Sequence, residues 1–268
     1  MNMETYGHVF AGLYNKKWSN FALQAAPRIW KYYVEQAIHL DNNYVLDLCC
    51  GTGHLAHYFL KKEFQVTGID LSSGMLNYAK RNNSRYVETG QAAFVQADAT
   101  DFKLEQKFGL IVSTFDALNH LPDMHALKRC FRSVYNVTDD HGIFIFDLNT
   151  NKGLKGWTNI VIEDNEESMI VSRSFYDEMN LRAVTNMTGF SKNQNGDYDR
   201  FVHSITNTCF RLDEVKASLL EVGWNQVHFS KMKDLSAPIE TPEEEDRVFI
   251  VAQKNESSDN MKAHMSRN

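Results

Sequence analysis

Two kinds of hydrophobic periodicity alternate between residues 44 and 150. Short apolar runs are typical of buried strands, and stretches with apolar residues at every third or fourth position are typical of amphipathic helices. Their alternation predicts a parallel sheet covered by helices on both faces. The strand-like runs are YVLDLC (44–49), FQVTGID (64–70), AAFVQAD (92–98), FGLIVSTFD (108–116) and GIFIFDLN (142–149), and the helix-like stretches are HLAHYFLKKE (54–63), SGMLNYAKRNN (73–83) and ALKRCFRSVYNVT (126–138).

The pattern changes on both sides of this region. The first 43 residues have helical spacing, and Pro27 is expected to begin a second helix, because proline is favoured in the first turn. After residue 157 the pattern becomes strand-like around the turn NQNGD, which predicts a small antiparallel insertion. A helix at 211–224 and strands at 225–233 and 246–254 follow. We therefore expect five parts: a helical segment (1–43), a core (44–157), a β-rich insertion (158–208), elements that complete the core (209–254) and a mobile tail (255–268).

Composition narrows the functional classes. The chain has 268 residues, 43% of them hydrophobic, a net charge of -6 and a pI near 5.9. Scattered Lys and Arg argue against a nucleic-acid partner. The sequence has neither a signal-peptide layout nor an apolar run of membrane-spanning length, so we expect no membrane association. The cysteines lack zinc or redox spacing, which indicates free thiols in the cytoplasm and no metal site; they are Cys49, Cys50, Cys130 and Cys209.

The glycine-containing segment GTGHLA (51–56) suggests a nucleoside ligand. With Asp70 following 70 - 51 = 19 residues after Gly51, it fits the fingerprint of dinucleotide-binding proteins. Asp47, four residues before Gly51, opposes that interpretation, because its carboxylate would repel an anionic pyrophosphate. A ligand with an ammonium or sulfonium group would be attracted instead. Both ligand classes remain open on this segment alone.

Three aspartates follow successive strands at intervals of about one strand–helix unit. Asp47, Asp70 and Asp98 are 23 and 28 residues apart (70 - 47 and 98 - 70). They therefore reach the carboxyl edge of the sheet, where open α/β sheets bind ligands. Asp70 is suited to a ribose diol and Asp98 to an exocyclic adenine amine, with Leu71 and Met75 on the faces of the purine. For the aspartates the alternative is helix capping or turn formation, and for the apolar residues it is core packing.

Four segments in this order resemble the successive motifs of class I S-adenosylmethionine-dependent methyltransferases, of the small-molecule (N-)methyltransferase type: VLDLCCGTGHLA, GIDLSSGML, QADATDF and STFDALNHL. In the family the first motif is an acid followed by glycines at alternate positions. Here those positions hold Asp47, Cys49, Gly51 and Gly53, so that Cys49 departs from the pattern. The resemblance implies a doubly wound, seven-stranded, mostly parallel sheet of Rossmann-like type whose last strand is antiparallel. The helical segment would then be a lid, and the β insertion would cover the substrate.

The resemblance also implies roles for individual residues. S-adenosylmethionine would be the cofactor and S-adenosylhomocysteine its product. The backbone would come close to the methionine part of the cofactor at Cys49, Gly51 and Gly53. The carboxylate of Asp47 would attract the ammonium group. Asp98 and Ala99 would read the adenine edge, Phe115 would close over the ring, and Arg28 would approach the methionine carboxylate.

The helical segment carries an aromatic stripe of Tyr6, Phe10, Tyr14 and Trp18. Aromatic residues at this spacing usually belong to a core. However, LYNKKWSNFA (13–22) resembles the lid of small-molecule methyltransferases, in which Tyr14 and Trp18 would close over the cofactor. Tyr14 would also offer a hydroxyl group to the reaction.

His120 is the candidate general base, because it lies just past the fourth strand, where the family places residues that face the acceptor. Positioning of the substrate or helix capping are its alternative roles. Asp116 and Asn119 are weaker candidates for substrate contact. The stretch DALN differs from the Asn/Asp-Pro-Pro-aromatic signature of enzymes that methylate DNA bases or protein amides, which favours a small-molecule acceptor. The insertion's aromatic residues would shape its pocket or pack the small sheet: Phe175, Tyr176, Phe190, Tyr198 and Phe201.

The resemblance therefore implies methyl transfer to a small molecule, with nitrogen slightly favoured over oxygen because the segments around 14–21 and 113–122 are similar to those of small-molecule N-methyltransferases. Two alternatives remain: a nicotinamide-dependent oxidoreductase, which rests on the glycine segment alone, and a non-catalytic regulator that binds S-adenosylmethionine. The run EEEDR (243–247) is expected to be a solvated turn before the last strand. The sequence does not predict an oligomeric state.

Overall fold

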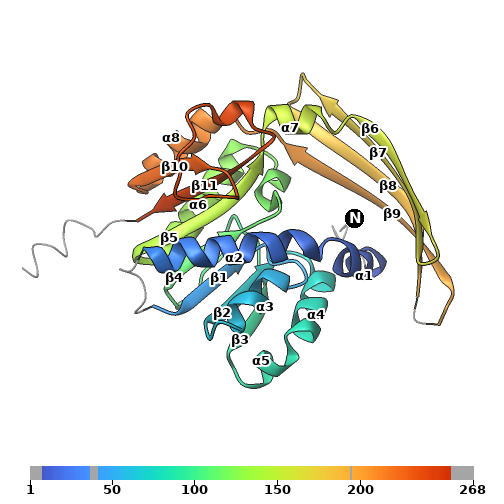
Figure 1. The fold of residues 1–268 in the computed structure, drawn as a ribbon, viewed down its shortest axis with the longest axis horizontal. Helices are drawn as coiled ribbons and strands as arrows, with labels where there is room; N and C mark the ends of the chain where they lie inside the picture. Colours follow the sequence, from blue (N-terminus) through green and yellow to red (C-terminus); the bar gives the residue numbers. More distant parts are fainter. Residues whose placement is uncertain (1–7, 37–41, 194, 255–268) are drawn as a thin grey trace, which may run out of the picture.

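The computed structural model describes residues 8–36, 42–193 and 195–254. Its centre is a seven-stranded sheet of the order β10-β11-β5-β4-β1-β2-β3 (Figure 1). Neighbouring strands are parallel, except that β11 is antiparallel to both β10 and β5. This confirms the predicted sheet with an antiparallel last strand. The strands are β1 (Tyr44–Leu48), β2 (Gln65–Asp70), β3 (Ala92–Gln96), β4 (Phe108–Ser113), β5 (Thr138–Asn149), β10 (Gln226–Ser230) and β11 (Arg247–Gln253).

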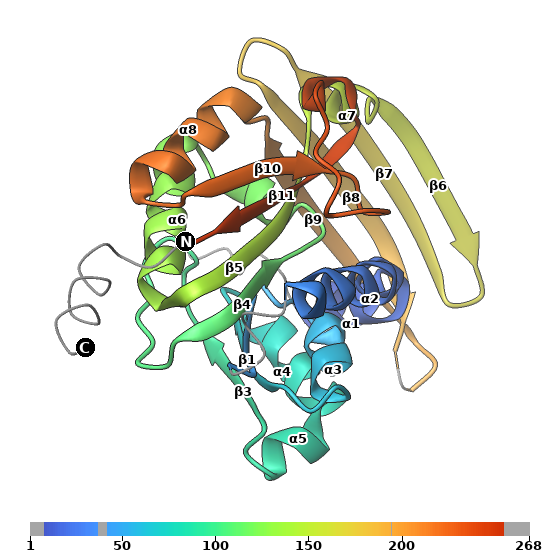
Figure 2. The same ribbon diagram turned by 60° about the vertical axis from the view of Figure 1, so that its left-hand side comes forward.

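Helices cover both faces of this sheet, which explains its nearly continuous apolar strands (Figure 2). Val45 packs with residues of α2 (Ser19–Glu35) and α3 (His54–Leu60). The next residue, Leu46, packs with residues of α6 (Met124–Val137) and α8 (Leu212–Val222) on the opposite face. Further helices are α4 (Ser73–Asn82), α5 (Ser84–Glu88), α7 (Asn151–Lys155) and the short 3₁₀ helices η1 (Ala117–His120) and η2 (Pro242–Glu244).

Pro27 does not begin a helix as the sequence suggested but lies inside α2. Proline has no N–H to donate to the carbonyl of Leu23, four residues earlier, and usually costs about 3 kcal/mol within a helix. Leu23 is exposed, so water can solvate that carbonyl. Ala25, Ala26 and Ile29 are fully buried on the opposite side. Burial of this apolar face maintains the helix through the proline.

The region after β5 forms a second, antiparallel sheet in chain order: β6 (Asn159–Asn165), β7 (Ser168–Asp177), β8 (Arg182–Lys192) and β9 (Tyr198–Thr208). The predicted β insertion is therefore present. Figure 1 shows this sheet curving over α1 (His8–Lys17). Ile170, Met187 and Phe201 on its inner face pack against Phe10 and Leu13 of α1.

The helix α1 is also joined to the second sheet by ion pairs and ring contacts. Lys16 Nζ lies 3.3 Å from Glu167 Oε2, and Lys17 Nζ lies 2.5 Å from Glu163 Oε2. The ring of Phe10 stacks on that of His203, with centroids 4.0 Å apart. Tyr6 of the aromatic stripe and the tail 255–268 lie outside the described residues. Across the described ranges, no helix is both long enough and apolar enough to span a bilayer.

Candidate functional site

A cavity of about 480 Å³ lies between the carboxyl ends of β1 to β4, the helix α1 and the inner face of the second sheet. Most residues predicted from the sequence line it: Tyr14, Trp18, Cys49, Gly51, Asp70, Leu71, Met75, Asp98, Ala99, Phe115 and His120. Asp47 lines a smaller cavity of about 30 Å³, which shares Tyr14, Trp18 and Cys49 with the large one. Gly53 is absent from the lining of both.

Asp70 is held at the end of β2 by two backbone groups. Its Oδ1 accepts from the N–H of Ser72 at 2.8 Å, and its Oδ2 accepts from the N–H of Gly51 at 2.8 Å. Burial raises the pKa of this carboxyl group, and the two backbone hydrogen bonds oppose that shift. Each carboxylate oxygen has a second lone-pair direction. Asp70 can therefore accept two hydrogen bonds from a pair of neighbouring hydroxyl groups.

Asp47 is a buried carboxyl group at the end of β1, with 2% of its surface exposed. Its Oδ2 accepts from the N–H of Ala56 in the first turn of α3, at 3.1 Å. Burial raises the pKa of Asp47 to about 8, and the charge of Asp70 adds to the shift. A cation placed beside Asp47 would favour its ionised form.

The backbone between β1 and α3 explains the glycine spacing. Cys49, Gly51 and Gly53 have φ values of 59°, 54° and 75°. Glycine adopts this left-handed conformation freely, whereas other residues are strained in it. Cys49 therefore occupies a position that favours glycine, which explains why the family pattern has glycine there. Burial raises the pKa of its thiol well above the ordinary value, so Cys49 stays protonated near neutral pH.

The two glycines of this loop have different surroundings. A side chain at Gly51 would point toward Tyr14, whose Cε1 would be 3.6 Å from the added Cβ. A Cβ on Gly53 would lie 2.8 Å from Asn83 Nδ2 and 3.0 Å from Ala79 Cβ. Gly51 thus borders the cavity, whereas Gly53 permits close packing of the loop on α4. The sequence did not distinguish these two functions.

The residues after β2 and β3 form the third part of the cavity wall. Asp98 is exposed, and its Oδ1 accepts from the N–H of Thr100 at 2.8 Å. Leu71 is 58% exposed beside the cavity, whereas Met75 is 2% exposed and also packs against α1. Cavity lining and core packing, which the sequence left as alternatives for Met75, are both present.

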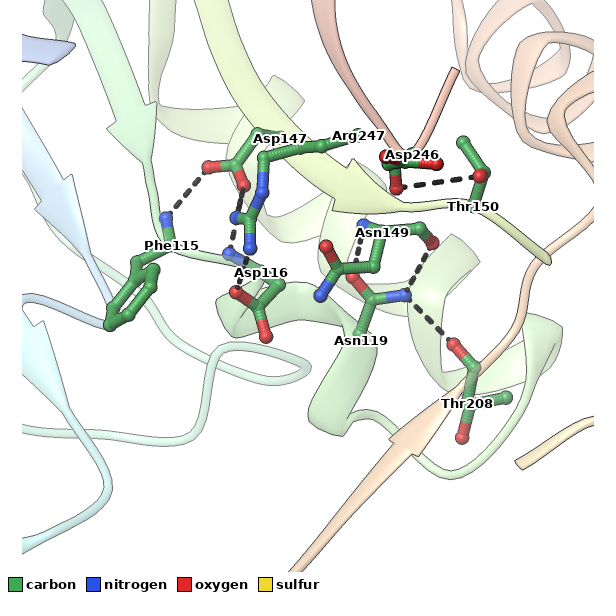
Figure 3. A network of polar contacts seen from close by, with 9 residues as sticks. All are labelled: Phe115, Asp116, Asn119, Asp147, Asn149, Thr150, Thr208, Asp246 and Arg247. Atoms are coloured by element: carbon green, nitrogen blue, oxygen red, sulfur yellow. Dashed lines mark hydrogen bonds and ion pairs between the residues drawn. The ribbon is translucent and has the colours of Figure 1, made fainter. Parts of the chain in front are cut away.

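After β4 the chain makes a turn in which Phe115 and Asp116 have φ values of 66° and 50°. Two consecutive non-glycine residues in this conformation are strained, and they persist only where the surroundings hold them. Asp147 of β5 accepts from both of their N–H groups, at 2.7 Å and 2.9 Å (Figure 3). The turn is therefore fixed from the neighbouring strand.

Arg247 of β11 completes this network (Figure 3). Its guanidinium donates to the carboxylate of Asp147 and, at 2.7 Å, to Oδ1 of Asp116. Burial opposes the positive charge, but Asp147 and Asp116 raise the pKa of Arg247 above its ordinary value. The sequence analysis placed Arg247 in a solvated turn. That was wrong, because its side chain is only 21% exposed and lines the cavity.

His120 lies at the end of η1, on the side of the cavity next to the second sheet. Its Nδ1 is 3.2 Å from the backbone oxygen of Thr206 in β9. A carbonyl oxygen can only accept, so Nδ1 carries the proton in this contact and Nε2 of the neutral ring keeps its lone pair. His120 is therefore oriented so that Nε2 can accept a proton.

Asn119, in contrast, is a structural residue. It is fully buried, and its Nδ2 donates to the backbone oxygens of Thr208 at 2.9 Å and Asn149 at 3.2 Å. The N–H of Asn149 donates back to its Oδ1 at 2.9 Å (Figure 3). Asn119 thus connects η1 to β5 and β9 and does not contact the cavity, contrary to the expected substrate contact.

Arg28 and the aromatic residues of the insertion do not line the cavity. Arg28 is exposed on α2 and donates to the backbone oxygen of Gln24, so it does not line the cavity. For the aromatic residues of the insertion the sequence left two alternatives, shaping the pocket or packing the small sheet, and none of them lines the cavity: Phe201 packs against α1, Tyr176 donates to Asn151, and Phe175, Phe190 and Tyr198 are exposed. The side of the cavity next to the second sheet is formed instead by Leu121, Trp157, Thr185, Met187, Ile205 and Asn207.

Comparison with known proteins agrees with this geometry. The sequence model of a family described as "Methyltransferase domain" matches residues 45–142. "Putative methyltransferase YqeM" of Bacillus subtilis (strain 168) is 28% identical over 231 residues, which are 85% of this chain and 90% of that protein.

Solved structures share the fold at low identity. An S-adenosylmethionine-dependent methyltransferase from Clostridium acetobutylicum ATCC 824 superposes with a TM-score of 0.76 at 21% identity, over 92% of this chain and 98% of that one. The sugar N-methyltransferase KedS8 from Streptoalloteichus sp ATCC 53650 gives a TM-score of 0.72 at 21% identity, over 96% of each chain.

Proposed function

This chain is a class I S-adenosylmethionine-dependent methyltransferase, and we propose that its acceptor is the nitrogen of a small organic molecule. The observation that carries the proposal is the orientation of His120, whose Nδ1 faces the backbone oxygen of Thr206. Its Nε2 is thereby free to take a proton within a cavity that also holds the cofactor-binding carboxylates. Methylation of an amine requires removal of such a proton, since a protonated nitrogen has no lone pair to attack with.

The donor groups fit S-adenosylmethionine. Asp70 has lone pairs for two ribose hydroxyls, and the backbone of Gly51 borders the cavity without a side chain. Asp47 is a buried acid that a cation would ionise, which suits the ammonium of the methionine part. When bound, the cofactor supplies a methyl group already activated by its sulfonium.

We assign the adenosine part to the residues after β2 and β3. Asp70 would accept from both ribose hydroxyls, and Asp98 with the backbone of Ala99 would bind the adenine edge. Leu71 and Met75 line the same end of the cavity and would contact the faces of the adenine ring. Phe115 lines the cavity from the turn after β4, while its ring stacks on that of Phe21 with centroids 4.8 Å apart.

Tyr14 and Trp18 would form the cover over the methionine part. Their ring centroids are 5.6 Å apart, and both residues line the large and the small cavity. Aromatic faces attract a sulfonium or ammonium cation and exclude water from it. Of the two, Tyr14 also carries a hydroxyl group that can bind the reacting groups.

A small acceptor with an apolar body fits the other side of the cavity. Leu121, Trp157, Met187 and Ile205 supply apolar surface there, with Thr185 and Asn207 as neutral polar groups. A base such as His120 can serve a hydroxyl group as well as an amine, so nitrogen is favoured over oxygen because KedS8, which shares the fold, is described as a sugar N-methyltransferase.

The test is methyl transfer from isotopically labelled S-adenosylmethionine to a panel of small amines and phenols. We expect the label on nitrogen, and a His120→Ala variant with a turnover number reduced on the order of 10²- to 10⁴-fold. His125→Ala, an exposed histidine on α6, is the matched control and should leave turnover unchanged. A labelled oxygen, or unchanged turnover of His120→Ala between pH 6 and 9, would remove the proposal.

A further inference from the structure

We infer that Asp116 binds the acceptor's amino group and that Arg247 is its positioning residue, so that the acceptor is an amine with an apolar body and no neighbouring phosphate. This inference rests on the proposed function and adds the charge of the substrate to it. It follows from three features of the network drawn in Figure 3: the strain of the turn, the pairing of Arg247 and the position of Asp116.

The turn at Phe115–Asp116 holds the side chain of Asp116 in one position. Both residues have left-handed backbones, and the two oxygens of Asp147 hold their N–H groups. Asp116 is 6% exposed and lines the cavity. A strained turn at the end of β4 that aims a buried carboxylate into a cavity is typical of a binding site. The network thus fixes Asp116 before any acceptor arrives.

Arg247 orients this carboxylate. Its Nη2 donates to Oδ1 of Asp116 at 2.7 Å, which leaves Oδ2 on the other side of the carboxylate (Figure 3). The guanidinium carbon also lies 4.8 Å from the ring centroid of Phe21 and 5.6 Å from that of Phe115. With Asp147 on Nη1, these contacts enclose the guanidinium. The guanidinium of Arg247 is therefore held by contacts within the protein, and it affects the acceptor through Asp116.

The charges around the cavity then determine the acceptor class. Among the residues that the structure describes, its lining includes the carboxylates of Asp70, Asp98 and Asp116 but a single guanidinium, that of Arg247. Because Arg247 is already paired with the carboxylates of Asp116 and Asp147, it offers little attraction to a phosphate, which Asp116 would repel. A protonated amine, in contrast, gains a charge-assisted hydrogen bond to Asp116. After binding, it can pass its proton to Nε2 of His120 in the same cavity.

The experiment compares three probes that share a phenethyl body: phenethylamine, 2-phenylethanol and phenethyl phosphate. Binding to the protein saturated with S-adenosylhomocysteine is measured by calorimetry at pH 8, where the amine is charged. We expect the amine to bind at least about tenfold more tightly than the alcohol, as for a hydrogen bond to a charged group, and the phosphate to bind more weakly than either. Equal binding of the three probes, or no detectable binding of the amine, would overturn the inference.

Variants then assign the effect to the two residues. Asp116→Asn should abolish the preference for the amine while keeping the affinity for S-adenosylhomocysteine, and the exposed Asp101→Asn should change neither. Arg247→Met should weaken amine binding by itself but add little to Asp116→Asn, because it acts through that carboxylate. If Arg247→Met does not fold, Arg247→Lys, which retains the charge without the two-pronged geometry, is expected to show an intermediate loss.

The two proposals fail in different ways. Methyl transfer to oxygen would contradict the proposed function. An N-methylated product made by an enzyme whose Asp116→Asn variant keeps its amine preference would leave the function intact and remove only the inference.

Discussion

The two sides of the cavity are built by different means. On the cofactor side, carboxylates are held by backbone N–H groups within 19 residues of them in sequence: Asp98 by Thr100, two residues away, Asp70 by Ser72 and Gly51, two and 19 residues away, and Asp47 by Ala56, nine residues away. On the acceptor side, Arg247 reaches Asp116 across 131 residues, and His120 reaches the backbone of Thr206 across 86. The first side is local and the second is assembled by the whole fold.

This difference indicates how the two sides can vary. A local turn keeps its geometry whatever is inserted elsewhere, so the cofactor side can be retained while the acceptor side changes. The acceptor side depends on the second sheet and on β11, both of which come after the alternating strands and helices from β1 to β5. Substitutions on one side should therefore have little effect on the other.

The largest effect should come from Asp70→Ala. This change removes the acceptor for both ribose hydroxyls and also releases the N–H groups of Gly51 and Ser72. Hydrogen bonds to a charged group are worth about 1.5–3 kcal/mol each, so the dissociation constant of S-adenosylhomocysteine should rise on the order of a hundredfold or more. Calorimetric titration measures it, with exposed Asp101→Ala as the control. A change of less than tenfold would mean that Asp70 does not bind the ribose.

Asp47→Asn should separate stability from cofactor binding. With its pKa raised to about 8, Asp47 binds a proton in the folded protein that the unfolded chain releases near pH 4. Between these values the folded state holds more protons, so this group makes the free energy of unfolding fall as the pH rises. The variant lacks that slope, so its melting temperature should match that of the wild type at or below pH 4 and exceed it by a few degrees at pH 9.

The same variant should bind S-adenosylhomocysteine more weakly, because it has no carboxylate to attract the ammonium group. A melting difference that is independent of pH, or an affinity equal to that of the wild type, would show that Asp47 is only a cap for α3.

Trp18→Ala tests whether the helix α1 covers the cofactor. Removing this ring opens both cavities to water, and the affinity for S-adenosylhomocysteine should fall on the order of tenfold, as expected when a cation loses an aromatic partner and shielding from water. Tyr14→Phe, which keeps the ring, should have a smaller effect. Trp30→Ala on α2 is a matched control, because Trp30 packs against the core away from the cavity. If all three variants bind S-adenosylhomocysteine as tightly as the wild type does, the aromatic stripe only packs the core and does not cover the cofactor.

The smallest effect is expected for Cys49→Gly. Relief of the left-handed strain at Cys49, about 1 kcal/mol, is offset by the greater freedom of glycine in the unfolded chain. The melting temperature and the affinity for S-adenosylhomocysteine should stay close to those of the wild type. Cys49→Val, in contrast, places a β-branched residue at a φ of 59° and should lower the melting temperature by several degrees. Equal behaviour of the two variants would exclude backbone strain as the reason for glycine at this position.

The contrast between the local cofactor side and the acceptor side, which is assembled by the whole fold, also explains which residues could be predicted from the sequence. The sheet, its flanking helices and the residues after β1, β2 and β3 follow from hydrophobic periodicity and short-range motifs. Arg247 and Asp147 could not be found that way, because only the antiparallel pairing of β11 with β5 brings them together. One signal was available: both are charged residues within apolar strand patterns, FIFDLN and DRVFIV, and buried charges are usually paired.

Other misjudged residues failed for the same physical reason. Asn119 and His120 are neighbours in sequence, but η1 directs Asn119 into the core and His120 into the cavity. Among the insertion's residues, Met187 and Ile205 line the cavity because of strand alternation and register, neither of which can be read from the aromatic content alone. Pro27 was misplaced because the burial of a helix face outweighs a single lost hydrogen bond.

The most direct test of the division between the two sides is the rise in melting temperature caused by S-adenosylhomocysteine in the wild type and in His120→Ala, Asp116→Asn and Arg247→Met. A ligand at a hundred times its dissociation constant adds about 2.7 kcal/mol, or a rise of about 5–10 °C for a chain of this size. We predict the same rise in all four proteins and none with NADH. A smaller rise in the three variants would show that the acceptor side also holds the cofactor, and would contradict the account.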